Sequence, residues 1–460
     1  TPGRTLFPYT TLFRSKKKNM LRRKIEEVLI KWKNIPNHKP LIIKGCRQCG
    51  KTFSVNAFAQ EHYTHVVYLN FFEHPDYKLA FEGSKQIDSI VMNLTALLPN
   101  SRFVSGQTCI ILDEIQECSA ARTALKFFKI DGRYDVIATG SLLGVCGYKG
   151  DETDYNSIPV GYEQHIEMFP LDFEEFLWAN GINQEIIELL TKSLQERTPI
   201  PPAIHQRMRQ LILEYTIVGG MPEVVNRFIA THNMSDVLEE QHSIITGYKE
   251  DMVKYAANED KVRLRAALDS IPRQLSKENK KFQFSVIKKG ARAKEYITGI
   301  QWLEDAGIII RCRNLSITEL PLEGNAIEDS FKVYMRDTGL FVSMLEEGTQ
   351  FDILQGRLYG YKGAIFENLI ADIFIKMGRK LYYYRKDSGL EIDFVIRYHS
   401  ECVLVEVKAS TGNTKSTKTI LQHPDKYHVY QAIKLGDYNI GEKDGILTLP
   451  VYMAFLLREY

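Results

Sequence analysis

Apolar positions in the first half of the chain form short runs separated by stretches with helical spacing. Five of these runs read as strands, namely "LIIKG" (41–45), "THVVYLNF" (64–71), "TCIILDEIQE" (108–117), "YDVIATGS" (134–141) and "QHIEMF" (164–169). Strands that alternate with helices are typical of a parallel sheet covered on both faces. This half is therefore expected to form a three-layer α/β fold.

The second half has a different pattern. Residues 182 to about 262 have the apolar spacing of amphipathic helices, which suits a helical lid, and residues 285–314 predict a helix, a turn at Gly307 and a strand, as at the end of a winged helix. We expect a non-native leader at 1–19, a core at 20–181, a helical lid at 182–262, a winged-helix segment at 263–345 and a C-terminal α/β domain at 346–460.

Composition sets broad limits on the class of protein. Apolar residues make up 44% and charged residues 25% of the chain, which is ordinary for globular protein, and no apolar run approaches the ~18 residues of a membrane span. A net charge of +2 gives no global indication of a nucleic-acid partner. Seven cysteines, an odd number without a signal peptide, favour a reducing cytoplasm over a disulfide framework.

The segment "KGCRQCGKT" (44–52) fits two kinds of site. Its cysteine pair has the spacing of a redox dithiol or of half a zinc site, but the histidines supply no second half. The same letters satisfy G-x-x-x-x-G-K-[ST] between an expected strand and an expected helix, the setting of a phosphate-binding P-loop. Gly45 and Gly50 would turn backbone N–H groups toward phosphates, Lys51 would reach the outer phosphates, and the Thr52 hydroxyl would face Mg²⁺. The P-loop interpretation is therefore favoured.

Two further strands end in side chains suited to the same chemistry. Asp113 is placed to hold Mg²⁺ through water, and Glu114 to polarise the attacking water. Either Thr139 or Ser141 would contact the γ-phosphate, unless both merely cap a turn. The expected catalytic pair is Lys51 and Glu114, and the expected nucleotide-binding set is Gly45, Arg47, Gln48, Cys49, Gly50, Lys51, Thr52, Phe53, Asp113 and Ser141, with Thr52 and Asp113 on the metal.

Five motifs follow one another between Gly45 and Val225: "G-x-R-Q-x-G-K-T", "LDEIQ", "TGS", "FPLDFEEFL" and "GGMPEVV". This order resembles the AAA-type ATP-binding proteins of bacteria and archaea, relatives of the archaeal ATPases, in which a P-loop core precedes a C-terminal domain of unknown function. The resemblance implies ATP rather than GTP and a winged helix between the two. Many relatives carry an arginine finger soon after "GS", whereas this chain reads "IPVGYEQ", which leaves Arg122 and Arg133 as candidates. The glycines of "GGMPEVV" favour a structural turn.

The segment from Ile271 to Tyr296, called the basic segment below, is strongly positive. It sets eight basic residues against two acidic ones, for a local charge of +6. Such a cluster predicts contact with a phosphate backbone, and the alternatives are a solvated lysine-rich loop or a winged helix that binds protein. The basic residues are Arg273, Lys277, Lys280, Lys281, Lys288, Lys289, Arg292 and Lys294.

A second chemical constellation lies near the C-terminus. "GLEIDFVIR" and "CVLVEVKAS" predict a β-hairpin that carries Asp393 on one strand and Glu406 and Lys408 on one side of the other. The helix over "YKGAIFENLIADIFIK" leaves Glu367 off its apolar stripe. The set is similar to the D…E-x-K core of restriction-endonuclease-like nucleases, in which Glu367, Asp393 and Glu406 would hold Mg²⁺ and Lys408 would activate water. A surface strand with a chance Glu–Lys pair is the alternative.

The leading interpretation is a cytoplasmic, Mg²⁺-dependent ATPase whose nucleotide cycle changes how the C-terminal domain engages DNA. One alternative is a nucleotide-regulated, Mg²⁺-dependent DNA nuclease. Another is a scaffold that binds ATP, oligomerises and recruits protein without catalysis. The expected partners are ATP and, through the basic segment, DNA. No membrane contact is expected, and an oligomer is compatible with each interpretation.

Overall fold

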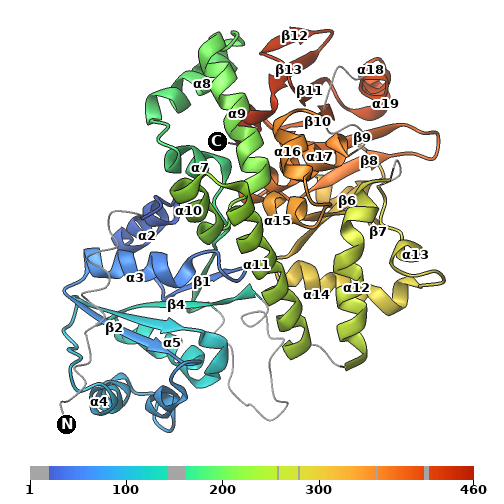
Figure 1. The fold of residues 1–460 in the computed structure, drawn as a ribbon. Coiled ribbons are helices and arrows are strands. Elements are labelled where there is room, and N and C mark those ends of the chain that lie inside the picture. Colours follow the sequence, from blue (N-terminus) through green and yellow to red (C-terminus); the bar gives the residue numbers. More distant parts are fainter. Residues whose placement is uncertain are drawn as a thin grey trace.

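In the computed structural model, two β-sheets organise the chain, one built from residues 41–167 and the other from residues 309–450 (Figure 1). The structure describes residues 20–142, 161–255, 258–277, 280–357, 361–408 and 414–459. Within these ranges, every helix is too short or too polar to traverse a lipid bilayer. The expected leader at 1–19 lies outside the described residues.

The first sheet is parallel throughout and has the order β2-β3-β4-β1-β5. All six residues of β3 are buried, as expected for a central strand of a sheet covered on both faces. The parallel α/β core predicted from the apolar runs is therefore confirmed. Its strands are β1 (Leu41–Gly45), β2 (His65–Asn70), β3 (Thr108–Asp113), β4 (Asp135–Ser141) and β5 (Gln164–Glu167).

Helices cover both faces of this sheet because side chains alternate along each strand. Leu41 and Ile43 pack in one apolar cluster with residues of α2 (Ile25–Asn34) and α3 (Lys51–His62). Ile42 packs on the opposite face in a second cluster. That face is covered by η2 (Pro75–Phe81), α4 (Ile87–Leu97) and α5 (Ser119–Asp131), with η3 (Ile115–Glu117) following β3.

A group of helices connects the two sheets, and α9 and α11 run between them in Figure 1. Most of these helices occupy the region expected to be helical, and α12, α13 and α14 continue through the basic segment. α14 is followed by Gly307 with φ +73° and then by β6. Their bounds are α7 (Phe173–Ala179), α8 (Gln184–Glu196), α9 (Pro202–Val218), α10 (Pro222–Thr231), α11 (Met234–Tyr255), α12 (Asn258–Leu275), α13 (Phe284–Ile287) and α14 (Ala293–Asp305).

The second sheet is mixed and has the order β12-β13-β11-β10-β9-β8-β6-β7. β6 (Ile309–Leu315) is the strand expected after the turn at Gly307, and it forms an antiparallel hairpin with β7 (Ala326–Met335). β6 also pairs in parallel with β8 (Tyr382–Arg385). The sheet therefore crosses the expected division between residues 345 and 346. Sequence periodicity cannot reveal this pairing, because it joins strands about 70 residues apart.

The C-terminal part follows the order α17, β8, β9, β10, α18, β11. β9 is antiparallel to β8 and β10, whereas β11 is parallel to β10. Apolar residues of α17 cover one face of this sheet, and residues of α18 and α19 cover the other. The elements are η4 (Leu322–Asn325), α15 (Thr338–Ser343), α16 (Thr349–Leu354), α17 (Lys362–Lys376), β9 (Glu391–Tyr398), β10 (Glu401–Lys408), α18 (Lys415–Leu421), α19 (Pro424–Tyr427), β11 (Gln431–Gly436), β12 (Gly441–Lys443), β13 (Ile446–Pro450) and η5 (Val451–Leu456).

Candidate functional site

The loop between β1 and α3 has the shape that its glycines permit. Gly50 adopts φ +93°, in the region that favours glycine, and Gln48 also has a positive φ of 61°. A Cβ on Gly45 would lie 2.3 Å from the carbonyl oxygen of Met168, so the approach of the chain after β5 requires glycine there. The loop and the start of α3 together form a cradle of backbone N–H groups at the carboxyl edge of the sheet.

Lys51 lies inside this cradle. Its ammonium donates to the carbonyl oxygens of Gly45 at 3.0 Å and Cys46 at 2.8 Å, and the side chain is buried. For Lys51 to bind a phosphate in the loop, its ammonium must therefore exchange these two carbonyl oxygens for phosphate oxygens. Phe53 is exposed in the first turn of α3, and Ser141 lies beside Gly45 in the β1–β4 register.

Asp113, at the end of β3, accepts hydrogen bonds from the neighbouring strands β2 and β4 and from α3. Thr52 Oγ1 lies 3.1 Å and 3.2 Å from its two carboxylate oxygens, and Tyr68 OH donates to Oδ2 at 2.6 Å. Asn70 Nδ2 lies 3.3 Å from the same oxygen, and Thr139 donates to Oδ1. Burial and the Asp113 carboxylate raise the pKa of Tyr68. The structure thus brings together Thr52 and Asp113, the expected metal pair, and places Thr139 rather than Ser141 on the carboxylate.

Glu114 follows Asp113 in a left-handed conformation, with φ 54° and ψ 50°. The Gln116 side-chain amide donates to the Glu114 carboxylate, which fixes where that carboxylate points. Neither candidate finger is free, because Arg122 pairs with Glu163 at 2.9 Å and Arg133 pairs with Asp131 at 2.8 Å.

The loop cysteines are buried free thiols in contact with each other. The hydrogen bond with Cys46, followed by the charges of Lys51 and Arg23, lowers the pKa of Cys49 to about 6 in spite of burial. The same hydrogen bond, together with burial, raises the pKa of Cys46. No group of three or more His, Cys, Asp or Glu side chains suited to a metal is found in the described ranges, so the zinc alternative has no further ligands there.

Three contacts tie the P-loop to distant segments. Arg23, just before α2, donates to the Cys49 carbonyl oxygen at 3.0 Å. Arg47 forms an ion pair with Asp251 of α11 at 2.5 Å, and Tyr248 OH of the same helix lies 3.4 Å from the Arg47 carbonyl oxygen. These contacts connect the loop directly to α11 and to the segment just before α2.

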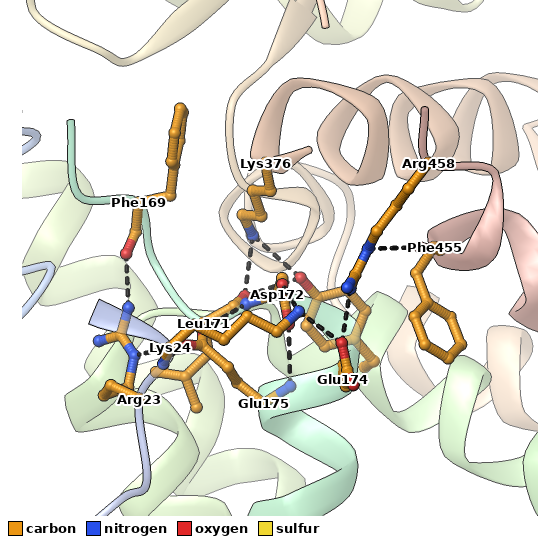
Figure 2. A network of polar contacts seen from close by, with 11 residues as sticks. Arg23, Lys24, Phe169, Leu171, Asp172, Glu174, Glu175, Lys376, Phe455 and Arg458 are labelled. Carbon is orange, nitrogen blue, oxygen red and sulfur yellow. Dashed lines mark hydrogen bonds and ion pairs between the residues drawn. The ribbon is translucent and has the colours of Figure 1, made fainter. Parts of the chain in front are cut away.

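The "FPLDFEEFL" motif forms a buried polar junction around the start of α7 (Figure 2). Asp172 caps the helix by accepting from the Glu175 N–H at 2.9 Å, and Glu175 in turn accepts from Arg23 Nε at 3.1 Å. Burial raises the pKa of Glu175, and the charge of Arg23 opposes that shift. Glu174 pairs with Lys24 at 2.6 Å and with Arg458 near the C-terminus at 2.5 Å. The start of α7 therefore holds both ends of the described chain.

The glycines of "GGMPEVV" pack against the same junction. The Leu171 N–H donates to the Gly220 carbonyl at 2.7 Å, and the Gly220 N–H donates to Asp337 Oδ2 at 2.7 Å. A Cβ on Gly219 would lie 2.1 Å from Asp337 Oδ1, and one on Gly220 would lie 2.0 Å from the Leu171 oxygen. These contacts agree with a structural interpretation of the motif. Lys376 of α17 completes the junction by donating to the Leu171 oxygen at 3.1 Å.

The expected C-terminal side chains do converge. Lys408 Nζ lies 2.7 Å from Glu406 Oε1. Burial lowers the pKa of Lys408, but the hydrogen bond to Glu406 and the charges of Asp393, Glu406 and Glu367 outweigh it and raise the pKa above its usual value. Asp393 accepts from the Val407 N–H at 2.8 Å, and burial followed by the charge of Glu367 raises its pKa to about 6. The four residues predicted from the hairpin and helix thus share one electrostatic environment.

Two lysines that the sequence did not single out enter the same cluster. Lys332 of β7 is fully buried and lies 2.9 Å from Glu391 and 3.9 Å from Glu367. Lys280 of the basic segment pairs directly with Glu367. Burial opposes ionisation of Glu367, but the charges of Lys280 and Lys332 outweigh it and hold its pKa below the usual value. Glu367 is 4% exposed, so it faces this cluster and not solvent.

This arrangement bears on the expected metal set. Glu367, Asp393 and Glu406 do not form a group suited to a metal among the described residues, and lysines pair with both Glu367 and Glu406. The sequence signal for Lys332 is a single charged residue inside the otherwise uncharged run "FKVYM", all of which is buried in the structure.

The geometry of the first sheet and its edge is that of a P-loop nucleoside triphosphatase core. Residues 37–177 match the family described as AAA domain, which supports an AAA-type P-loop ATPase core. Residues 209–350 and 362–453 match two further families, described as Domain of unknown function (DUF8612) and Domain of unknown function (DUF4143). No curated protein matches the chain.

Several solved structures are similar to the chain at low identity. A Walker-type ATPase of Pyrococcus abyssi is 13% identical, with 71% of this chain and 97% of that chain covered and a TM-score of 0.43. The ORC2 protein of Aeropyrum pernix in ADPNP and ADP complexes is 12% identical, with 73% and 93% covered and a TM-score of 0.35. AMPPCP-bound DnaA from Aquifex aeolicus is 13% identical, with 63% and 90% covered and a TM-score of 0.29. At these TM-scores the likeness adds nothing about chemistry.

Proposed function

We propose that the chain is a Mg²⁺-dependent ATPase whose nucleotide cycle controls how its second half engages DNA. The contact between Thr52 and Asp113, beside Lys51 in the loop, is the observation that supports this most strongly. A hydroxyl and a carboxylate at this edge are oxygen ligands of the kind that Mg²⁺ prefers. When bound, Mg²⁺ would neutralise charge on the phosphates.

Each residue of the site has a role that its present contacts suggest. Lys51 would leave the Gly45 and Cys46 carbonyls and donate to the outer phosphates. Thr139 and the other hydrogen-bond donors on Asp113 would keep that carboxylate oriented. Glu114 would accept a proton from the attacking water, and Gln116 is a positioning residue because it holds the carboxylate.

Coupling to the second half would run through the contacts of the loop itself. The ion pair of Arg47 with Asp251 joins the loop to α11, and Arg23 joins it to the α7 junction. Seven of the eight basic residues of the basic segment are exposed, which suits a phosphate backbone. The buried free cysteines among the described residues suit a reducing compartment, and we propose a cytoplasmic location.

ATP turnover of the full chain, measured with and without duplex and single-stranded DNA, tests this proposal. Glu114→Gln is expected to bind ATP normally and to hydrolyse it at least about a hundredfold more slowly, because the general base is lost. Glu61→Gln, on the exposed side of α3, is the matched control and should behave as wild type. If no DNA changes the rate of ATP turnover and the chain shows no salt-sensitive DNA binding, the scaffold alternative is favoured. ATP-dependent oligomerisation is the measurement that tests that alternative.

A second candidate function is a Mg²⁺-dependent nuclease, and the convergence of Glu367, Asp393 and Glu406 on Lys408 favours it. In such a site the carboxylates hold the metal and the lysine orients water. Cleavage of plasmid or branched DNA by wild type and not by Asp393→Asn would support this function. Equal cleavage by both proteins would assign it to a contaminant and remove the candidate.

A further inference from the structure

The thiol groups of the P-loop cysteines are not used by the nucleotide chemistry described above. Cys46 and Cys49 are free thiols in hydrogen-bond contact with each other, and both belong to the same buried apolar cluster. The two residues between them, Arg47 and Gln48, are exposed. The thiols therefore lie directly beneath an exposed turn of the P-loop.

Cys49 is the more reactive of the two thiols. The Lys51 ammonium lies 4.0 Å from Cys49 Sγ, and the hydrogen bond with Cys46, followed by the charge of Lys51, lowers the pKa of Cys49 to about 6 in spite of burial. The thiolate is the nucleophilic form of cysteine, so Cys49 can attack at neutral pH. When protonated, Cys49 donates instead to the Met168 carbonyl oxygen at 3.5 Å. Cys46 keeps its proton, because the same pairing and burial raise its pKa.

The other described cysteines lack this environment. Burial raises the pKa of all four, so they remain protonated thiols: Cys109, Cys118, Cys312 and Cys402. Buried thiols without a nearby cation are inert toward oxidants. Oxidation of the described part of the chain is therefore expected to begin at the P-loop.

We propose that Cys46 and Cys49 are an oxidisable dithiol that hydrogen peroxide converts to a disulfide, and that the disulfide form of the loop binds ATP weakly. This inference rests on the proposed ATPase function and adds a means of regulating it. The Cys49 thiolate attacks one peroxide oxygen and releases hydroxide, which leaves a sulfenic acid on Cys49. The Cys46 thiol then attacks that sulfur, and its proton leaves with the sulfenic hydroxyl as water. Two electrons thus pass from the thiols to the peroxide, and burial of both sulfurs excludes bulkier oxidants.

The cross-link closes a ring around the turn of the P-loop. A disulfide brings two sulfurs closer together than a hydrogen bond between thiols does, so the turn from Cys46 to Cys49 has to contract. Lys51 donates to the carbonyl oxygen of Cys46 and Arg23 to that of Cys49, so both cations are bound to residues that move. Contraction therefore displaces the backbone N–H groups and the ammonium that phosphates need. Conversely, a bound phosphate would draw Lys51 away and leave the Cys49 thiolate without its counter-charge.

Peptide mapping and ATP titration of the full chain, reduced or treated with hydrogen peroxide, test the dithiol. Trypsin cuts after Lys44, Arg47 and Lys51, so the disulfide should appear as two short linked peptides that dithiothreitol separates. Oxidised wild type should bind ATP at least about tenfold more weakly than reduced wild type, as expected when one hydrogen bond to a charged group is lost. Dithiothreitol should restore the affinity. Saturating ATP should slow formation of the linked peptides, because coupling between two binding events is reciprocal.

Each variant is compared with its own reduced form. Cys49→Ala and the more conservative Cys49→Ser remove the nucleophile, so peroxide should leave their ATP affinities unchanged. Cys402→Ala removes a buried cysteine of β10 and is the matched control, which should keep the full response of wild type.

Three results would overturn the proposal. They are the absence of linked peptides in peroxide-treated wild type, equal ATP affinity of its oxidised and reduced forms, and an equal loss of affinity in the Cys49 variants. Reduced wild type that binds no ATP would instead refute the ATPase function, and the linked peptides would then support the dithiol alone.

Discussion

Gly220→Ala probes the junction between the ATPase core and the second half most sharply, because the effect is purely steric. Gly220 lies outside the left-handed region of φ, so alanine meets no backbone strain there. The added Cβ would, however, lie 2.0 Å from the Leu171 carbonyl oxygen and 2.9 Å from the Leu171 nitrogen. Leu171 and Gly220 would have to separate by about 1 Å or more to restore ordinary contact distances.

That separation breaks two short hydrogen bonds, which sets the magnitude. The Leu171 N–H loses the Gly220 oxygen, and buried Asp337 loses the Gly220 N–H, each at 2.7 Å in wild type. Overpacking costs about 1–3 kcal/mol, and a buried group left without its partner costs about 1–3 kcal/mol. Gly220→Ala should therefore lower the free energy of unfolding by roughly 2–6 kcal/mol.

Urea unfolding followed by circular dichroism measures this difference, with limited proteolysis to locate the loosened segment. Gly247→Ala is the matched control, since an added Cβ meets nothing within 4 Å there and the residue lies inside α11. Alanine in that helix should be neutral or stabilising by about 0.5–1 kcal/mol. If Gly220→Ala unfolds at the same urea concentration as Gly247→Ala, the close contact at the junction is not present in solution.

Two further predictions concern charges around the core. Arg23→Met should lower the free energy of unfolding by roughly 3 kcal/mol, because buried Glu175 loses its ion-pair partner and the Cys49 carbonyl loses a hydrogen bond, and urea unfolding indistinguishable from wild type would contradict this. The pKa of His38 is raised by its hydrogen bond to Asp135, so the protonated ring stabilises the fold fully below its ordinary pKa of 6.5 and loses that effect as the pH rises through the higher folded value. His38→Gln should therefore destabilise the chain more at pH 6 than at pH 9, and an equal loss at both would contradict the assignment.

Local patterns predicted the first sheet and its loop well. Each apolar run of the first half became a strand, Thr52 contacts Asp113, and the Lys51 ammonium lies within the loop. Such motifs carry their meaning within a few residues, and parallel strands bring their carboxyl ends to one edge. The sequence therefore sufficed for most of the candidate nucleotide site.

Partners from distant segments were not predictable in the same way. Tyr68 and Asn70 hold Asp113 only because β2 neighbours β3, and nothing in "VVYLN" identifies them as polar contacts. Lys280 and Lys332 reach Glu367 through a sheet whose strands come from both sides of an expected domain division. These pairings are set by tertiary packing, which hydrophobic periodicity does not encode.

ATP hydrolysis by Lys51→Ala, measured beside Lys31→Ala on the exposed face of α2, tests the central claim most directly. Loss of the ammonium that lies inside the loop should reduce ATP turnover at least about a hundredfold, while Lys31→Ala keeps the wild-type rate. Wild-type turnover in Lys51→Ala would mean that this loop does not carry the reaction, and the account of the nucleotide site would be wrong.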